Sequence, residues 1–241
     1  MPRNGYGNPQ GQPGGQPYGA FQAAGDRPMT VDDVVVKTAV TLGLAIVTGA
    51  LTILFHASVL AIPALLVGLV VSMIIIFKRK PNAPLVLTYA AAEGVLLGAI
   101  TGLFESVYPG IAFQAIIGTF GVFAAMLVVY KTGAVRVTPR LTKWVIGATV
   151  GVVVVMLANL VISLFGVDLG IRSGGPLSIV FSLIVIGIAA FNLLLDFEQA
   201  DRMIREGYPA RWAWYAAFGL MTTLVWLYLE ILRLLSYMQR N

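Results

Sequence analysis

The chain contains no cysteine and a single histidine, His56, among its 241 residues. The absence of cysteine excludes disulfides and thiolate metal sites, and one histidine argues against histidine-based catalysis and against most zinc and haem sites. Charged residues are also scarce, at 11% of the sequence, against about 25% in a typical soluble domain. Because 58% of the residues are hydrophobic, a soluble fold would expose large apolar patches and aggregate. The composition therefore indicates an integral membrane protein.

The sequence also lacks the short motifs of common enzyme classes. It has no Gly-x-Ser-x-Gly, no His-Glu-x-x-His and no phosphate loop. An intramembrane aspartyl protease needs two aspartates at mid-depth in facing helices, but Asp168 and Asp196 fall at opposite ends of their predicted spans. We therefore predict that the protein is not an enzyme and that it uses no cofactor.

The first 29 residues contain no apolar run and are rich in Gly, Pro, Gln and Asn. Such a composition cannot bury enough surface to offset the entropy of ordering, so residues 1–29 are predicted to form a disordered tail. Residues 30–241 are predicted to form one membrane domain. The net charge of +5 does not indicate a nucleic-acid partner, because basic residues of membrane proteins gather in cytoplasmic loops.

Seven apolar stretches are long enough to cross a bilayer as helices, which takes about 20 residues for a hydrocarbon core about 30 Å thick. They are apolar all round rather than alternating, and this favours helices over a β-barrel. Turn signals and charges separate them. The predicted spans are Val34–Phe55, Ser58–Phe77, Leu85–Phe104, Ile111–Tyr130, Trp144–Phe165, Pro176–Phe197 and Ala213–Met238. The predicted fold class is an all-α integral membrane protein with seven transmembrane helices.

The basic residues predict the orientation of these spans. Thirteen of the sixteen Lys and Arg residues fall in the N-terminal region and the loops after the second, fourth and sixth spans. The other side carries Arg172, Arg233 and Arg240. The positive-inside rule then places the N-terminus in the cytoplasm and the C-terminus outside.

Small residues and one proline predict local packing. Gly94, Gly98 and Gly102 repeat every four residues in the third span, and Gly147 and Gly151 do so in the fifth. Such faces let helix backbones approach closely. A proline inside the second span, at position 63, is expected to kink that helix.

Polar residues at membrane depth are the candidate functional residues, because a charge at the bilayer centre costs roughly 2.5–3.5 kcal/mol on insertion scales. Glu93 lies near the middle of the third span, Asp196 follows Asn192 near the end of the sixth, and Glu230 precedes Arg233 in the seventh. Each has a structural alternative. Glu93 could be protonated and hydrogen-bonded, Asp196 could begin a solvated acidic turn, and Glu230 could form a local pair with Arg233. As a set, the carboxyls suggest transient cation binding or proton uptake, and these two compete for the same lone pairs.

Two motifs carry a resemblance to a known family. The run NLLLDFEQ at 192–199 resembles the sixth-helix motif of the Bax inhibitor family, and LYLEILRLL at 227–235 resembles its seventh-helix motif. The basic loop at 78–80 and the Glu93-Gly94 pair fit as well. The runs TVDDV at 30–34 and FGLMTTLVW at 218–226 resemble the actinobacterial branch. The resemblance covers about residues 30–238.

This resemblance implies a seven-helix fold whose last helix is central and wrapped by the other six. It also implies a pH-sensitive calcium leak, in which carboxylates of the sixth and seventh helices share a proton and a basic residue latches onto the sixth-helix aspartate. The corresponding residues here are Asp196 and Glu230 for the pair and Arg79 for the latch. Calcium would pass transiently at the pair rather than reside in a metal site.

The spacing of the pair sets a condition on this mechanism. If the hairpin between the last two helices turns near Gly207, Glu230 lies 12 residues further from the turn than Asp196, about 18 Å along a helix axis. The two carboxyls can then meet only if residues 208–214 form an extra segment before the seventh span. The aromatic residues of that stretch suit an interfacial segment.

Two functions remain open from the sequence, and a coupled transporter is a variant of the first. The first is a cation leak channel for Ca²⁺, gated by protonation of Asp196 and Glu230 in a bacterial plasma membrane. The second is a non-enzymatic interaction protein that modulates a membrane protease or serves as an accessory subunit. Both have the lipid bilayer as a partner, and neither fixes the oligomeric state.

Overall fold

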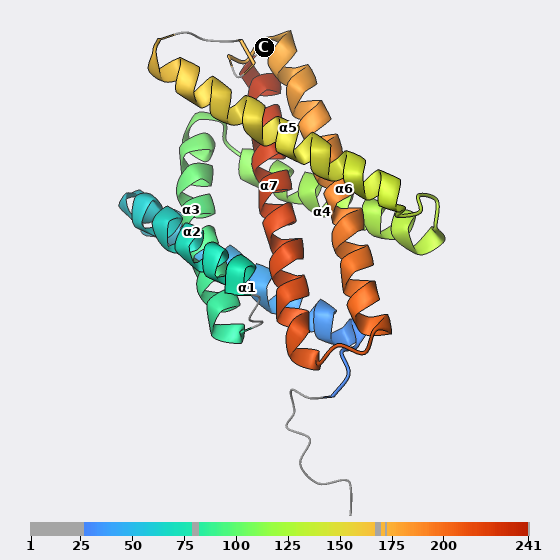
Figure 1. Cartoon of the computed structure of the whole chain (residues 1–241). Coiled ribbons are helices and arrows are strands. Elements are labelled where there is room, and N and C mark those ends of the chain that lie inside the picture. The colour runs from blue at the N-terminus through green and yellow to red at the C-terminus, as the bar shows by residue number, and fades with distance from the viewer. Residues whose placement is uncertain (1–26, 79–81, 167–169, 172, 241) are drawn as a thin grey trace, which may run out of the picture.

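The computed structural model describes residues 27–78, 82–166, 170–171 and 173–240. Seven long helices in these ranges are each long and apolar enough to cross a membrane, which confirms the predicted fold class. Two short 3₁₀ helices complete the set (Figure 1). The elements are α1 (Val31–Leu54), η1 (Ser58–Leu60), α2 (Ala61–Lys78), α3 (Ala83–Val107), α4 (Ile111–Thr132), α5 (Pro139–Leu164), α6 (Pro176–Arg205), η2 (Ala210–Trp212) and α7 (Ala213–Arg240).

The helix ends follow local chemistry. Thr30 caps α1 with a capping box, in which its hydroxyl accepts from the Asp33 amide while Asp33 accepts from the Thr30 amide. Gly133 ends α4 in a left-handed conformation, with φ of 67°, which glycine adopts without a Cβ clash. Thr138 caps α5 immediately before Pro139, and proline is favoured at the first helical position.

The sixth helix differs most from its predicted span. It continues through charged residues to Arg205, eight residues beyond the predicted end at Phe197. No proline or glycine interrupts the chain until Gly207, and Arg202 and Arg205 in the last turn complement the helix dipole. The predicted acidic turn at Asp196 is therefore helical.

Pro63 lies at the start of a helix and not inside one, where the predicted kink would form. Pro63 is the third residue of α2 and follows η1. The first amides of a helix have no intrahelical acceptor, so a proline there removes no hydrogen bond. Pro63 therefore helps to begin α2 rather than interrupting it.

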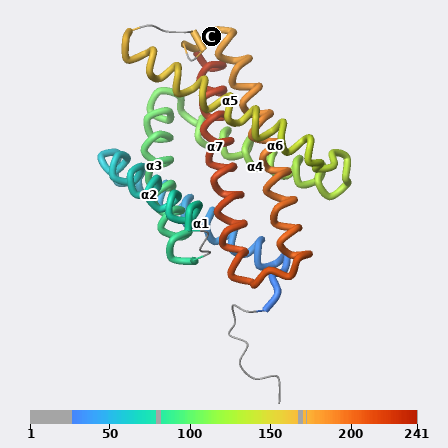
Figure 2. The backbone as a smooth tube through the Cα atoms, in the orientation of Figure 1, coloured from blue at the N-terminus to red at the C-terminus, as the bar shows by residue number. Residues whose placement is uncertain are grey.

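Helix α7 runs through the middle of the bundle (Figures 1 and 2). It is the most buried of the seven spans, and its principal neighbours are α1, α3, α4 and α6. Helix α2 packs mainly on α3, and α5 packs mainly on α6. The last helix is thus central, as predicted, but its close neighbours are four helices rather than six. The C-terminal end of α7 and the loop between α6 and α7 lie at opposite ends of the bundle.

Of the two predicted small-residue faces, one packs against another helix and one does not. A Cβ at Gly94 or Gly98 would overlap the backbone of α1 at Ala45 and Gly49, so these glycines allow the close α1–α3 contact. By contrast, no described atom lies within 4 Å of a Cβ built at Gly147 or Gly151 of α5. The predicted face in the fifth helix therefore makes no such packing contact within the described part of the chain.

Candidate functional site

Asp196 lies where α6 faces the central helix. It precedes the end of α6 at Arg205 by nine residues, about 14 Å along the axis, and its side chain is half-buried. The Thr223 hydroxyl of α7 donates to Asp196 Oδ2 at 2.6 Å. Asp196 Oδ1 lies 3.4 Å from the position that a Cβ would take at Gly219, one turn earlier on α7. The Asp196 carboxyl group therefore packs against a glycine and a threonine that lie four residues apart on α7.

Glu230 lies further along α7 and is nearly inaccessible, with 2% of its surface exposed. Arg233 Nη1 donates to Glu230 Oε1 in a local i,i+3 pair. The local pair that the sequence left as an alternative for Glu230 is thus present. An i,i+3 pair joins neighbouring residues of one helix, so this contact of Glu230 lies within α7.

The structure does not bring Asp196 and Glu230 together. Asp196 contacts Gly219 and Thr223, and Glu230 lies seven to eleven residues beyond them, roughly 10–16 Å along α7. The extra segment that pairing required is present as η2, but it comprises only Ala210–Trp212. One short turn cannot shift α7 by the 12 residues that the sequence showed to be necessary.

Of the other predicted residues, Asn192 has a clear position. Asn192 donates to the Thr149 hydroxyl of α5 at 2.8 Å and to the Ile188 carbonyl of its own helix at 2.9 Å, so it links α5 to α6. Arg79, the latch candidate, lies outside the described residues. The acidic residues after Asp196 form their own cluster at the end of α6, where Arg205 pairs with Glu198 at 2.9 Å and with Asp201 at 2.6 Å.

Glu93 lies on the opposite side of the bundle core, on α3. Its Oε1 is 3.5 Å from the position that a Cβ would take at Gly68 of α2, and Tyr89 lies one turn earlier on the same helix. Tyr89 is 4% exposed and its hydroxyl accepts from Thr222 of α7 at 3.3 Å. Tyr89 therefore bonds α3 to the central helix, whereas the hydrogen bond predicted for Glu93 stays a prediction.

Sequence reasoning missed the α7 partners of these carboxyls. The sequence motifs include Thr222 and Thr223 only within the run at 218–226, and they predict no packing role for Gly219. The available signal was a glycine followed four residues later by a hydroxyl residue, a spacing that places both on one helix face. The sequence does not show which residues of α6 and α7 face each other.

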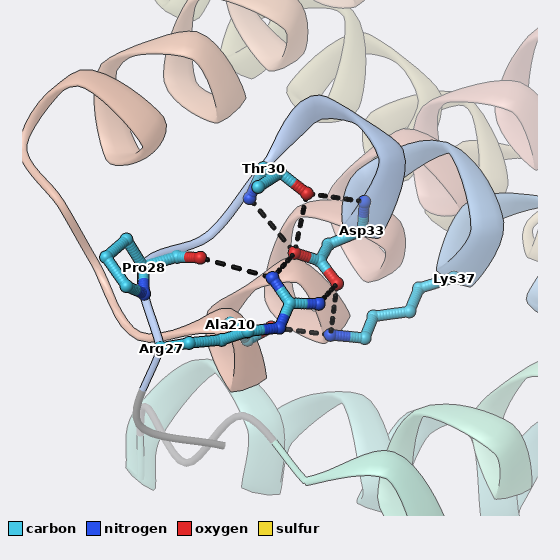
Figure 3. A network of polar contacts seen from close by, with 6 residues as sticks. All are labelled: Arg27, Pro28, Thr30, Asp33, Lys37 and Ala210. Atoms are coloured by element: carbon cyan, nitrogen blue, oxygen red, sulfur yellow. Dashed lines mark hydrogen bonds and ion pairs between the residues drawn. The ribbon is translucent and has the colours of Figure 1, made fainter. Parts of the chain in front are cut away.

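A polar clasp ties the start of the described chain to the loop between α6 and α7 (Figure 3). Arg27 donates to both carboxylate oxygens of Asp33, at 2.8 and 2.7 Å, and Lys37 donates to the Ala210 carbonyl. The Asp33 carboxylate raises the pKa of Arg27. The backbone pairs as well, because the Met29 amide donates to the Tyr208 carbonyl at 2.7 Å.

The clasp shortens the predicted tail. Met29 is 2% exposed and belongs to the core cluster that includes Phe197 and Ala213. The segment at 27–29, predicted as part of a disordered tail, is thus anchored to the membrane domain. The prediction for residues 1–26 lies outside the described residues.

An apolar cleft of about 210 Å³ lies between α1, α3, α4 and α7, away from Asp196. Its lining includes Gly49, Phe120 and Leu224 but no charged residue. Its polar border is the hydrogen bond of 2.8 Å between the Thr101 and Tyr228 hydroxyls. A cleft of this chemistry suits a hydrocarbon chain rather than a cation.

The sequence as a whole matches the family model described as Bax inhibitor 1 like, over residues 4–240. The chain belongs to the Bax inhibitor 1 like family. No curated protein matches it. Family membership and seven spans together establish a multi-pass membrane protein in contact with a lipid bilayer.

In this Bax inhibitor 1 like protein the two motifs that carried the resemblance lie at different depths. The sixth-helix motif faces α7 at Thr223, whereas the glutamate of the seventh-helix motif pairs with Arg233. Within the described ranges no three His, Asp or Glu side chains gather at one point. Asp196 and Glu230 are thus two separate carboxyl sites, each with its own partner.

Proposed function

We propose that this Bax inhibitor 1 like protein is a pH-sensitive cation leak channel for Ca²⁺, with Asp196 as its protonation site. The observation that supports this most is the position of Asp196, half-buried between α6 and the central helix and bonded to Thr223. Carboxyl groups enclosed between the helices of a membrane protein are costly and commonly mark ion or proton pathways. The proposed location is a bacterial plasma membrane, with the N-terminus in the cytoplasm and the C-terminus outside.

The proposed mechanism needs one carboxyl group at the α6–α7 contact rather than a shared pair. An ionised Asp196 accepts from Thr223 and can also offer oxygen to a passing Ca²⁺, which prefers oxygen ligands. A proton on Asp196 occupies the same lone pairs and removes the negative charge. Proton binding and cation binding therefore exclude each other, and the leak should weaken as the pH falls.

Glu230 has a different role in this proposal. Its pair with Arg233 supplies a positive charge beside the carboxyl, which lowers the local attraction for a cation. We propose that Glu230 and Arg233 stabilise α7 rather than gate the path. The latch role of Arg79 remains a proposal carried by the family resemblance alone.

Reconstituted liposomes with an enclosed calcium dye would test the channel. We expect wild-type flux to fall between about pH 8 and about pH 6 as protons compete with the cation. Asp196→Asn should lower the flux at the higher pH by about tenfold, equivalent to about 1.4 kcal/mol of lost interaction, and should flatten its pH dependence. Absence of flux at every pH, or unchanged flux in Asp196→Asn, would contradict the proposal.

Glu198→Gln is the matched control for this experiment. Glu198 lies two residues later on α6 and contacts Arg205 and Tyr130 instead of α7. It is a carboxyl of the same helix without a bond to α7, so the pH profile of flux should keep its shape. A flattened profile in Glu198→Gln would mean that the acidic end of α6, not Asp196, senses pH.

The alternative, a non-enzymatic interaction protein, has support from α5. Gly147 and Gly151 present a small-residue face without a described neighbour, and faces of this kind mediate helix contacts in membranes. Photo-crosslinking from Ala148 in native membranes would test it. Recovery of uncrosslinked protein alone would count against this function.

A further inference from the structure

The apolar cleft between α1, α3, α4 and α7 lies toward one end of the bundle. Its lining on α1 falls within 42–53 and its lining on α3 within 97–101, in the later parts of both helices. Its lining on α4 falls within 112–120, in the first part of that helix. Gln239 near the end of α7 donates to Gln114 of α4 at 3.5 Å. The cleft therefore lies in the half of the bundle that contains the C-terminal end of α7.

The cleft is continuous with the surface that faces lipid. Ile46 of α1 lines it and is 53% exposed, and Ile116 and Phe120 of α4 line it and are 38% and 44% exposed. Its inner wall is the central helix, where Leu224 is only 4% exposed. Because the exposed side chains belong to membrane-spanning helices, they lie in the hydrocarbon core of the bilayer. The cleft therefore opens sideways from the bilayer toward α7.

Water is a poor occupant of this cleft. A buried water molecule needs two to four polar partners, and the hydroxyls of the lining are already bonded within the protein. Those of Thr101 and Tyr228 bond to each other at 2.8 Å, and Thr119 donates to the Ala115 carbonyl at 2.7 Å. A cleft without any occupant would forfeit the dispersion contacts of its walls. The lining therefore favours an apolar occupant from the membrane.

The size of the cleft excludes a helix as that occupant. One turn of an α-helix about 10 Å across and about 5.4 Å long occupies roughly 420 Å³. The cleft measures about 210 Å³, which is half of that volume. A helix of a second copy or of another membrane protein therefore does not fit, whereas a single flexible run of methylene groups does.

We propose that this cleft binds one acyl chain of a membrane phospholipid, from the leaflet on the side of the C-terminal end of α7. In the predicted orientation this is the outer leaflet. The bound chain packs against Leu224 and Val225 and fills the space between α7 and the three helices around it. The inference does not depend on the proposed channel, because it rests on the shape and chemistry of the cleft alone.

Photo-crosslinking with a phosphatidylcholine that carries a diazirine in the middle of one acyl chain tests this site. The full chain is reconstituted at high dilution in liposomes that contain this lipid, illuminated, and mapped by peptide mass spectrometry. Lipid adducts are expected at Leu224 and Val225 of the central helix as well as on the exposed side chains of α2. Adducts on α2 without any at these two residues would overturn the inference.

A variant that fills the cleft separates the bound chain from general contact with lipid. Ala50 lines the cleft from α1. The ring in Ala50→Phe displaces at least about two methylene groups of the chain, so adducts at Leu224 and Val225 should fall by about tenfold or more. Ala112→Phe fills the cleft from α4 and replaces Ala50→Phe if that variant does not fold. Unchanged adducts in a folded filling variant would overturn the inference.

Ala39→Phe is the matched control. Ala39 is exposed on α1, eleven residues before Ala50 and thus within about 20° of the same face, but it lies outside the lining of the cleft. Its substitution should leave the adducts on the central helix unchanged. An equal loss of these adducts in Ala39→Phe and Ala50→Phe would overturn the inference.

A second copy of the chain is the occupant against which the last arm is directed. The chain has no cysteine, so Ala50→Cys and Ala39→Cys each supply a unique thiol. A short bis-thiol reagent added to the same dilute liposomes should leave both variants monomeric. Crosslinked dimers of Ala50→Cys but not of Ala39→Cys would overturn the inference in favour of a second copy.

Discussion

Thr223 is the residue through which α7 holds Asp196, and Thr223→Val tests that contact. Valine keeps the volume of threonine but cannot donate to Asp196 Oδ2. Hydrogen bonds to charged groups contribute about 1.5–3 kcal/mol, so a loss of stability of that order is expected in thermal unfolding of the purified protein. Thr119→Val is the matched control, because the equally buried Thr119 donates only to its own helix at Ala115. Equal losses in both variants would argue against a special α6–α7 bond.

Met29 is the apolar part of the clasp at the start of the chain. Its side chain is 2% exposed in the main core cluster, so Met29→Ala should lower the free energy of unfolding by about 2–5 kcal/mol. Met238 near the end of α7 is 60% exposed, and Met238→Ala should cost far less. Chemical denaturation in detergent would compare the two. Similar costs would show that the segment at 27–29 does not pack as described.

The α1–α3 contact depends on the absence of side chains. Gly98→Ala would place a methyl group against the Gly49 backbone of α1, and overpacking of this kind costs about 1–3 kcal/mol. Gly102→Ala, one turn later on the same face, meets only Ile53 Cγ1 at 3.8 Å and should be tolerated. Thermal unfolding of the two variants measures the difference. If Gly102→Ala destabilised the protein as much as Gly98→Ala, the loss would come from replacing a helical glycine in general. It would then not come from the α1–α3 contact.

Helix existence and helix length depend on different signals. Each predicted span proved to be a helix because apolar residues of that number can satisfy their backbone groups in lipid only as a helix or a closed barrel. The end of α6 was predicted eight residues too early because four of the eight residues at 198–205 are charged, and hydropathy reports lipid exposure rather than helicity. Ion pairs among Glu198, Asp201 and Arg205 stabilise that extension outside the apolar span.

The orientation of the whole bundle can be tested because the chain has no cysteine. Glu206 directly follows α6 and Gln239 lies near the end of α7; both are exposed, and they lie at opposite ends of the bundle (Figure 1). Single Cys substitutions there provide unique labels. A membrane-impermeant thiol reagent added to intact cells should label Gln239→Cys and spare Glu206→Cys, because the basic loops are predicted to be cytoplasmic. The reverse labelling pattern would overturn the predicted orientation.

The amino-acid sequence by itself determined the class of the protein and its seven crossings, and it singled out the carboxyl residues on which the proposed function rests. These properties depend on the order of apolar and charged residues. In lipid, apolar runs form helices because their backbone groups must be paired internally, and charged residues stay in the loops outside the bilayer. Only the tertiary structure decided which groups meet. It placed Asp196 against Thr223 and Glu230 beside Arg233, and it bonded Tyr89 of α3 to Thr222 of α7. The physical reason is register, because the depth at which two helices face each other depends on loop length and side-chain packing along the whole contact.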